Sequence, residues 1–253
     1  MCRILKICLI QSGLYILSCC SIFNIEAFGQ SEEDLSLNNQ FWFDYDLSFQ
    51  MGDKWYLHGD LGFRTIVPHI WNRYFIGTAV RFNVPKLIFK KLKYKEELLG
   101  GIHFYYTTNF DFSDRLEIRP FQGYRLSWPD RERIRLRHYV RLEERFDINT
   151  SNWKNTFGLR FRYLAELTIK LQGDVIHDIK GVYLPVSVEL FWNLIGTKQF
   201  NDNLRFTSGV GYGFSEKWRV EFNLAYHYAR NTVLDEFNSS DIVYRFRAFY
   251  QIK

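Results

Sequence analysis

The most regular feature of the chain is an alternation of apolar and polar residues with a period of two. It recurs in segments of roughly ten to fourteen residues, and turn-forming residues separate these segments. Because successive side chains of a β-strand point to opposite faces, each segment is a predicted strand. The predicted strands lie at about 38–49, 54–66, 70–82, 96–107, 114–127, 132–146, 155–169, 182–192, 203–214, 217–229 and 241–252.

The segment 132–146 shows the alternation most clearly. Its odd positions hold five arginines, whereas its even positions are mostly Ile, Leu and Val between Ile134 and Phe146. An arginine that faces hydrocarbon at the middle of a bilayer costs about 2–4 kcal/mol, so five of them would cost more than the net stability of a domain. The arginine face must therefore meet water or ionic partners, while the apolar face suits lipid. A helix does not fit, because the apolar stripe at i, i+3 and i+4 is absent.

The same division recurs in 114–127, 155–169, 217–229 and 241–252. Long strands with one charged and one apolar face predict an all-β fold, a closed antiparallel transmembrane β-barrel whose charged face lines the lumen. The residues predicted to line the lumen are Arg115, Glu117, Arg119, Arg125, Arg133, Arg135, Arg137, Arg141, Glu143, Arg145, Arg160, Arg162, Glu166, Arg219, Glu221, Arg245 and Arg247.

The pattern predicts the fold but leaves the number of strands open. We count eleven segments, whereas a closed antiparallel barrel normally needs an even number. We therefore expect ten or twelve strands and favour twelve, with a further strand at 172–180; the alternative is that the Lys-rich stretch 84–95 disturbs the strands beside it. Tryptophans near the predicted strand ends are expected to form interfacial girdles. They are Trp42, Trp55, Trp71, Trp128, Trp192 and Trp218.

A soluble β-sandwich is the alternative fold. Its strands also alternate, but its inner face would be apolar and its outer face a mixture of Lys, Thr and Ser. Here the polar face is mostly Arg, with Glu, Gly and Tyr, and the apolar face is large and aromatic in nearly every segment. These features favour the transmembrane barrel.

The N-terminal segment has the layout of a secretory signal peptide. Arg3 and Lys6 precede a mainly apolar run over 7–25, and Ala27-Phe28-Gly29 supplies small residues at a cleavage site. We expect residues 1–29 to be cleaved, 30–37 to form a short extension and 38–253 to form the barrel. Two alternatives are a retained transmembrane anchor and a lipobox that would leave a lipidated Cys19. All four cysteines lie before residue 21, so the cleaved chain would contain none.

Composition narrows the functional classes. Aromatic residues make up 19% of the chain, which argues against disorder. The net charge of +5 comes from arginines within predicted strands rather than from a basic surface patch, so we expect no nucleic-acid partner. A secreted barrel of this kind belongs in the outer membrane of a Gram-negative-type envelope, with outer-membrane lipids around it.

The arginine face has two non-enzymatic interpretations. In the first, arginines and acids interlock as an ion-paired structural filling, because every guanidinium must find partners; the expected acids are Glu97, Glu117, Glu143, Glu166, Glu189 and Glu221. In the second, the inward arginines exceed the inward acids, and the barrel is a porin-like, narrow anion-selective channel. Small anions or acidic saccharides would then be its solutes, because arginine binds carboxylate and phosphate in bidentate fashion.

An outer-membrane enzyme, such as a lipase or protease, is the third functional class. It needs a nucleophile beside a base, or a metal cluster. None of the six histidines has a zinc-binding spacing, and no serine has a nucleophile-like setting. His103 and His227 are expected to face inward near Glu97 and Glu221. We expect no catalytic residue, no metal and no cofactor. The glycines of 209–213 alternate within a predicted strand and are expected to make room inside the barrel.

Three segments carry a family resemblance. They are Arg119-Pro120-Phe121-Gln122-Gly123-Tyr124, then 137–146 with its Arg-Leu-Glu-Glu-Arg-Phe end, and Asn203-Leu204-Arg205 leading into Gly209-Val210-Gly211-Tyr212. Over about residues 38–252 the chain resembles a domain-of-unknown-function family of bacterial outer-membrane barrels. The resemblance implies an outer-membrane location and dependence on the barrel assembly machinery. It implies no reaction and no catalytic residues.

Overall fold

The structure is a computed structural model, and it describes residues 37–67, 71–84, 87–88, 95–109, 113–128, 133–171, 180–196, 203–230 and 238–252. The predicted signal peptide, Cys19 and almost all of the predicted extension lie outside these residues. So does 172–179, which holds nearly all of the twelfth strand that we favoured. Within the described ranges, no helix is long and apolar enough to cross a membrane.

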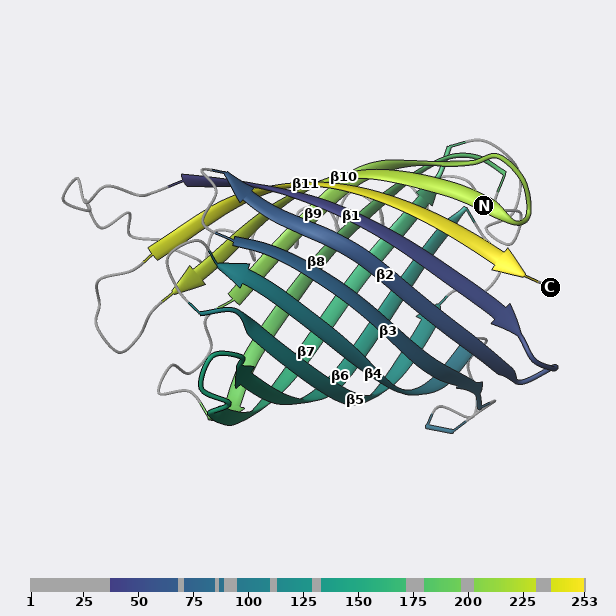
Figure 1. The fold of residues 1–253 in the computed structure, drawn as a ribbon. Helices are drawn as coiled ribbons and strands as arrows, with labels where there is room; N and C mark the ends of the chain where they lie inside the picture. The colour runs from purple at the N-terminus through teal and green to yellow at the C-terminus, as the bar shows by residue number, and fades with distance from the viewer. Residues whose placement is uncertain are drawn as a thin grey trace, which may run out of the picture. The chain divides into compact units, whose positions relative to one another are not determined.

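Eleven strands form one closed barrel (Figure 1), so the prediction of a closed all-β barrel is confirmed. Each strand pairs with its neighbours in the sequence, and the last strand returns to the first. The strands are β1 (Leu37–Gln50), β2 (Trp55–Val67), β3 (Trp71–Asn83), β4 (Lys95–Asn109), β5 (Arg115–Trp128), β6 (Ile134–Asn149), β7 (Asn155–Lys170), β8 (Gly181–Ile195), β9 (Asn203–Gly213), β10 (Trp218–Arg230) and β11 (Asn238–Ile252).

The closing pair of strands explains the odd strand number. β1 and β11 pair in parallel, from Leu37 opposite Ser240 to Phe49 opposite Ile252, whereas the other neighbouring pairs are antiparallel. A parallel ladder satisfies both edge strands as fully as an antiparallel one. The expectation of twelve strands was therefore wrong, because it assumed that all pairs in the ring would be antiparallel.

The barrel has an apolar exterior and a charged interior. On β6, Arg141 and Glu143 are buried, whereas Ile134 and Phe146 on the other face are 49% and 39% exposed. All eleven strands place at least one large apolar side chain on the exposed face. Examples, one from each strand, are Phe43, Leu61, Ile76, Phe104, Trp128, Ile134, Phe157, Val188, Val210, Phe222 and Phe246.

The tryptophans do not all share one environment. Trp55, Trp128 and Trp218 are exposed near strand ends, as predicted for a girdle. Trp42 is instead buried in the interior, and this part of the prediction was wrong. Its Nε1 donates a hydrogen bond to Gln40 Oε1 at 2.8 Å, and the Arg64 guanidinium lies 4.1 Å from its ring centre. A cation–π contact of this kind gives an inward tryptophan a favourable place among arginines.

Two glycines of β9 allow bulky side chains into the interior. A Cβ on Gly211 would lie 2.2 Å from the Tyr183 ring, and a Cβ on Gly209 would lie 2.2 Å from Asn223 Oδ1. Neither neighbouring atom belongs to the free end of a long, flexible side chain, so any residue larger than glycine would displace the Tyr183 ring or the Asn223 amide. The prediction that these glycines make room inside the barrel is confirmed.

Candidate functional site: the arginine-lined lumen

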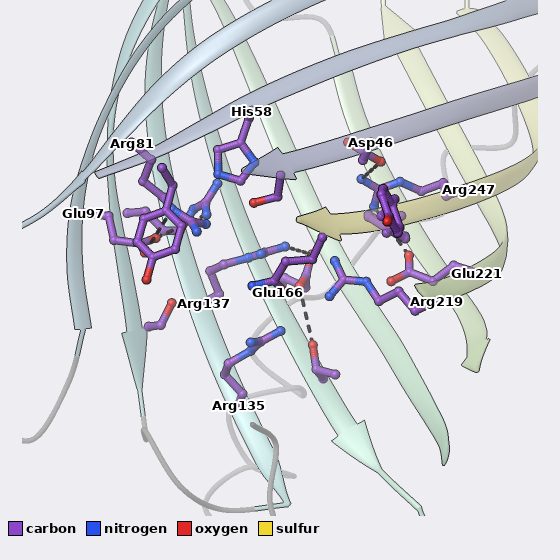
Figure 2. A pocket seen from close by; sticks show the side chains of 18 of the residues that line it. Asp46, His58, Arg81, Glu97, Arg135, Arg137, Glu166, Arg219, Glu221 and Arg247 are labelled. Carbon is purple, nitrogen blue, oxygen red and sulfur yellow. Dashed lines mark hydrogen bonds and ion pairs between the residues drawn. The ribbon is translucent and has the colours of Figure 1, made fainter. Parts of the chain in front are cut away.

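Inward side chains divide the lumen into two chambers of similar size. The lower chamber, about 470 Å³, lies toward the end of the barrel where β1 and β11 finish, and Figure 2 shows part of its lining. The upper chamber, about 460 Å³, lies toward the end where these two strands begin. Each volume falls within the range of small-molecule sites.

Five charged residues line both chambers and form a layer between them, which we call the dividing layer. They are Arg125, Arg137, Glu166, Glu221 and Arg247. Arg137 is ion-paired with Glu166, and Arg247 Nη1 lies 3.4 Å from Glu221 Oε2. Each chamber is therefore bordered on its inner side by groups whose charges largely compensate one another.

The dividing layer is anchored to the barrel wall by two further acids. Arg125 Nη1 lies 3.2 Å from Glu97 Oε2, and Arg247 Nη2 lies 3.1 Å from Asp46 Oδ2. Glu97 is buried and also pairs with Arg81 at 3.3 Å. The layer is thus held by strands from several parts of the ring rather than by one hairpin.

Glu143 is the centre of the largest ion cluster in the wall. Its side chain is fully buried, and its carboxylate lies 2.8 Å from Arg141 Nε, 2.5 Å from Arg160 Nη2 and 2.9 Å from Arg162 Nη1. Arg119 lies farther away, at 3.9 Å. The Arg141 contact is an ion pair rather than a hydrogen bond, because the Nε–H has no aligned acceptor. The carboxylate offsets part of the cost of removing water from these guanidinium groups, which outnumber it.

Two other wall acids extend this cluster through the upper chamber. Glu117 Oε1 accepts hydrogen bonds from Arg119 Nη2 at 2.8 Å and from Arg145 Nε at 2.5 Å. Glu189 is ion-paired with Arg162 and, at 3.0 Å, with Arg205. Each acid therefore fixes the orientation of at least two guanidinium groups.

The structure brings fifteen of the seventeen predicted residues to the interior. Arg135 and Arg219 line the lower chamber, the five residues of the dividing layer line both chambers, and Glu117, Arg141 and Glu143 are buried in the wall. The upper chamber is lined by Arg119, Arg145, Arg160, Arg162 and Arg245.

Arg115 and Arg133 line neither chamber. The Arg115 side chain is 52% exposed and pairs with Asp147 at 2.5 Å. Arg133 is exposed and precedes the first residue of β6. Both residues have the inward parity of their segments, but they lie at strand ends, where a side chain reaches the rim of the barrel.

Several interior residues were missed by the sequence analysis. Arg64, Arg73, Arg81 and Arg205 line the chambers, and Asp44 is buried and ion-paired with Arg245. The available signal was parity, because Asp44 alternates with aromatic residues in β1 just as the arginines do in β6. These strands have few charged residues at their inward positions, so the alternation of charged and apolar residues is weaker there than in β6.

The two inward histidines have partners other than those expected. His103 Nε2 lies 3.1 Å from Asp60, and its Nδ1 lies 3.1 Å from Arg141 Nη2. His227 Nδ1 lies 3.8 Å from Asp241 Oδ2. The expected neighbours, Glu97 and Glu221, are engaged with arginines instead. Within the described ranges, no group of three or more His, Asp or Glu side chains could hold a metal ion.

The lumen contains more arginines than its acids can pair with. In the part of the chain that the structure describes, four lumen arginines have no carboxylate within 4.0 Å: Arg64, Arg73, Arg135 and Arg219. Two of them line each chamber. The excess positive charge is therefore shared between the chambers and is available to an anion.

Comparison with known families identifies one match. The model of the family described as protein of unknown function (DUF2490) matches residues 39–238, from β1 to the first residue of β11. Comparisons with curated proteins and with solved structures gave no match. Because the match spans most of the chain, this protein belongs to the DUF2490 family, a family of unknown function.

Proposed function

We propose that this protein is an outer-membrane β-barrel whose lumen is selective for small anions. One observation carries the proposal: a barrel with an apolar exterior encloses more arginines than acids. The role proposed is binding and passage of solutes rather than catalysis. The surrounding lipids and the assembly machinery of the outer membrane are the partners that such a role requires.

The exterior supports insertion into a membrane. Exposed large apolar side chains come from all eleven strands, whereas soluble proteins rarely expose apolar patches above a few hundred Å². The strands contain 11 to 16 residues, and about 9–11 tilted residues are enough to cross a bilayer. The predicted signal peptide would deliver the chain across the inner membrane.

The charge of the lumen supports anion selectivity. Nine basic and four acidic residues line the lower chamber, and eleven basic and three acidic residues line the upper chamber. Even after the buried wall acids Asp44, Glu117 and Glu143 are counted with the upper chamber, the bases remain in excess. A narrow passage with low-dielectric walls concentrates this positive potential, which attracts anions and repels cations.

The dividing layer sets the expected conductance. An anion that passes from one chamber to the other must cross Arg137, Glu166, Glu221 and Arg247, which are ion-paired. We therefore expect small currents with strong anion selectivity rather than the large currents of an open pore. A lumen that serves as a structural filling would carry no current at all.

Conductance in a planar bilayer tests the proposal. The refolded protein should give a reversal potential of the anion-selective sign in a salt gradient, and Arg135→Glu with Arg137→Glu should lower or invert that selectivity. The matched control is Arg115→Glu with Arg133→Glu, which makes the same change in charge at the rim and outside both chambers. Folding of each variant is checked by its heat-dependent mobility in gels. A folded barrel without conductance, or with equal effects of the two pairs, would contradict the proposal.

A further inference from the structure

We propose that the lower chamber is a binding site for a phosphate group, held by Arg135 and Arg219 with the help of Arg137. The inference rests on the proposed function, since it names the class of anion that the lumen receives. It adds a place in the lumen and a chemical preference that anion selectivity alone does not imply.

The first argument is geometric. Arg135 comes from the start of β6 and Arg219 from the start of β10, strands that are separated by three others in the ring. Figure 2 shows both side chains directed into the chamber toward the region of Glu166, where Arg137 also lies. Three guanidinium groups from two walls therefore border the lower chamber, Arg137 at the dividing layer and Arg135 and Arg219 nearer the strand ends.

The second argument is that these three guanidinium groups have N–H donors without an acceptor in the protein. The Nε atoms of Arg135, Arg137 and Arg219 are buried, and each lacks a hydrogen-bond acceptor among the described residues. Buried donors in folded proteins nearly always have an acceptor, supplied by protein, water or an ion. Arg81, Arg125 and Arg247, which line the same chamber, also have an Nε without an acceptor, so the chamber presents several donors to an anion with several oxygens.

The nearby carboxylates do not serve as that acceptor, because none among the described residues lies within 4.0 Å of Arg135 or Arg219, and each is engaged with other groups. Glu166 is ion-paired with Arg137 and accepts a hydrogen bond from Thr168 Oγ1 at 3.5 Å. Glu221 accepts hydrogen bonds from Tyr183 Oη at 2.9 Å and Asn223 Nδ2 at 3.2 Å, as well as from Arg247. Arg219 lies over the Phe249 ring, 4.0 Å from its centre, which leaves its in-plane N–H donors free to point at a ligand.

The charge count favours phosphate over a simple carboxylate. Arg135 and Arg219 each bring one positive charge that no described acid pairs with. A phosphate monoester carries a charge of about −1.5 to −2 at neutral pH and offers three acceptor oxygens, so it can compensate both arginines and engage more than one fork. A monocarboxylate would leave one charge uncompensated. The volume of about 470 Å³ also leaves room for a small organic group on the phosphate.

The upper chamber is a natural comparison, because its two surplus arginines are used differently. Arg64 lies between aromatic rings, 4.1 Å from the ring centre of Trp42 and 4.8 Å from that of Phe75. Arg73 Nε donates a hydrogen bond to Thr107 Oγ1 at 2.8 Å. Arg73 thus gives its Nε–H to a protein acceptor, and Arg64, whose Nε also lacks an acceptor, is stacked between aromatic rings, so the same number of charges should bind phosphate less well there.

Calorimetry on the refolded barrel in detergent micelles tests the site. Titration with inorganic phosphate and with glycerol phosphate, in a buffer free of other multivalent anions, should show saturable binding, and acetate should bind at least tenfold more weakly. Arg135→Gln and Arg219→Gln should each weaken phosphate binding by about 10- to 100-fold, as expected for the loss of a hydrogen bond between charged groups. Arg73→Gln, the matched control in the upper chamber, should change binding by less than about threefold.

The outcomes separate this inference from the proposed function. Tighter binding of glycerol phosphate would identify organic phosphates as the ligands, and equal binding would identify the phosphate group itself. Equal affinities for phosphate and acetate in a barrel that is still anion-selective would overturn the phosphate site alone. So would a loss of phosphate affinity in Arg73→Gln as large as that in Arg135→Gln or Arg219→Gln. Should either Gln variant fail to fold, Arg219→Lys keeps the charge and removes the fork. Unchanged affinity in that variant would also overturn the site.

Discussion

Replacing Glu143 by glutamine removes the charge at the centre of the largest ion cluster while keeping the size of the side chain. Glu143 is fully buried and contacts Arg141, Arg160 and Arg162 within 3 Å. Glutamine retains one carbonyl acceptor but compensates no charge. The guanidinium groups around it would then repel one another in a site that water reaches poorly. We therefore expect a large loss of stability.

The size of the loss follows from the other partners of each arginine. Arg162 also pairs with Glu189, so it remains compensated. Arg141 keeps its contacts with His103 Nδ1, at 3.1 Å, and with the Phe121 ring, and neither Arg141 nor Arg160 has another carboxylate partner among the described residues. Two guanidinium groups thus lose their acid, and breaking a buried pair costs about 3–5 kcal/mol. Because both share the same lost carboxylate, we expect a total within this range rather than twice it.

The measurement is urea-induced unfolding of the barrel in lipid vesicles, followed by tryptophan fluorescence. The free energy of unfolding should fall by about 3–5 kcal/mol in Glu143→Gln. Glu144→Gln is the matched control on the opposite face of β6, where it has no ion-pair partner among the described residues. It should leave the stability within about 0.5 kcal/mol or raise it. A Glu143→Gln barrel as stable as the unaltered protein would refute the view that this cluster stabilises the fold.

Three further predictions test the dividing layer, the exterior and the closing strand pair. Arg137→Gln with Glu166→Gln breaks an ion pair of the dividing layer without changing the net charge, so single-channel conductance should rise while anion selectivity persists. Ile76→Arg places a charge on the exposed face in the middle of β3, and the free energy of unfolding in vesicles should fall by about 2–4 kcal/mol. Phe43→Cys with Phe246→Cys should form a disulfide under mild oxidation, seen as a gel-mobility shift, because these residues are partners in the parallel β1–β11 ladder; moving one cysteine four residues along its strand should abolish the cross-link.

The alternation of the sequence was enough to locate the strands, because the inward positions are mostly charged and the outward positions mostly apolar. The segment 114–127 became β5 (Arg115–Trp128), and 203–214 became β9 (Asn203–Gly213). The strand number was not accessible in the same way. Alternation reports which face a side chain occupies and carries no information on the direction of the neighbouring strand. Only the ring itself shows that β1 and β11 meet in parallel.

The interior was predictable where arginines follow one another at alternate positions, as in β6. It was not predictable where aromatic residues share the inward face. Trp42 and Tyr105 point inward and contact Arg64, so their segments seemed to have apolar residues on both faces. Arginine can be accommodated beside such rings by cation–π contacts, and this makes an inward aromatic residue indistinguishable from an outward one in a pattern based on hydropathy.

Ion-paired filling and anion binding are then two consequences of one charge distribution. Several buried acids hold two or more arginines in place, as Glu143 and Glu189 do, and this fixes the walls without adding net negative charge to the chambers. The arginines left over are few and are held on rigid strands, so they are already oriented before any anion arrives. If the acids equalled the arginines in number, the lumen would carry no net positive charge to select anions. The surplus arginines, rather than the total number, are therefore the feature on which the proposed anion selectivity depends, and Arg135 and Arg219 are the two that carry the proposed phosphate specificity.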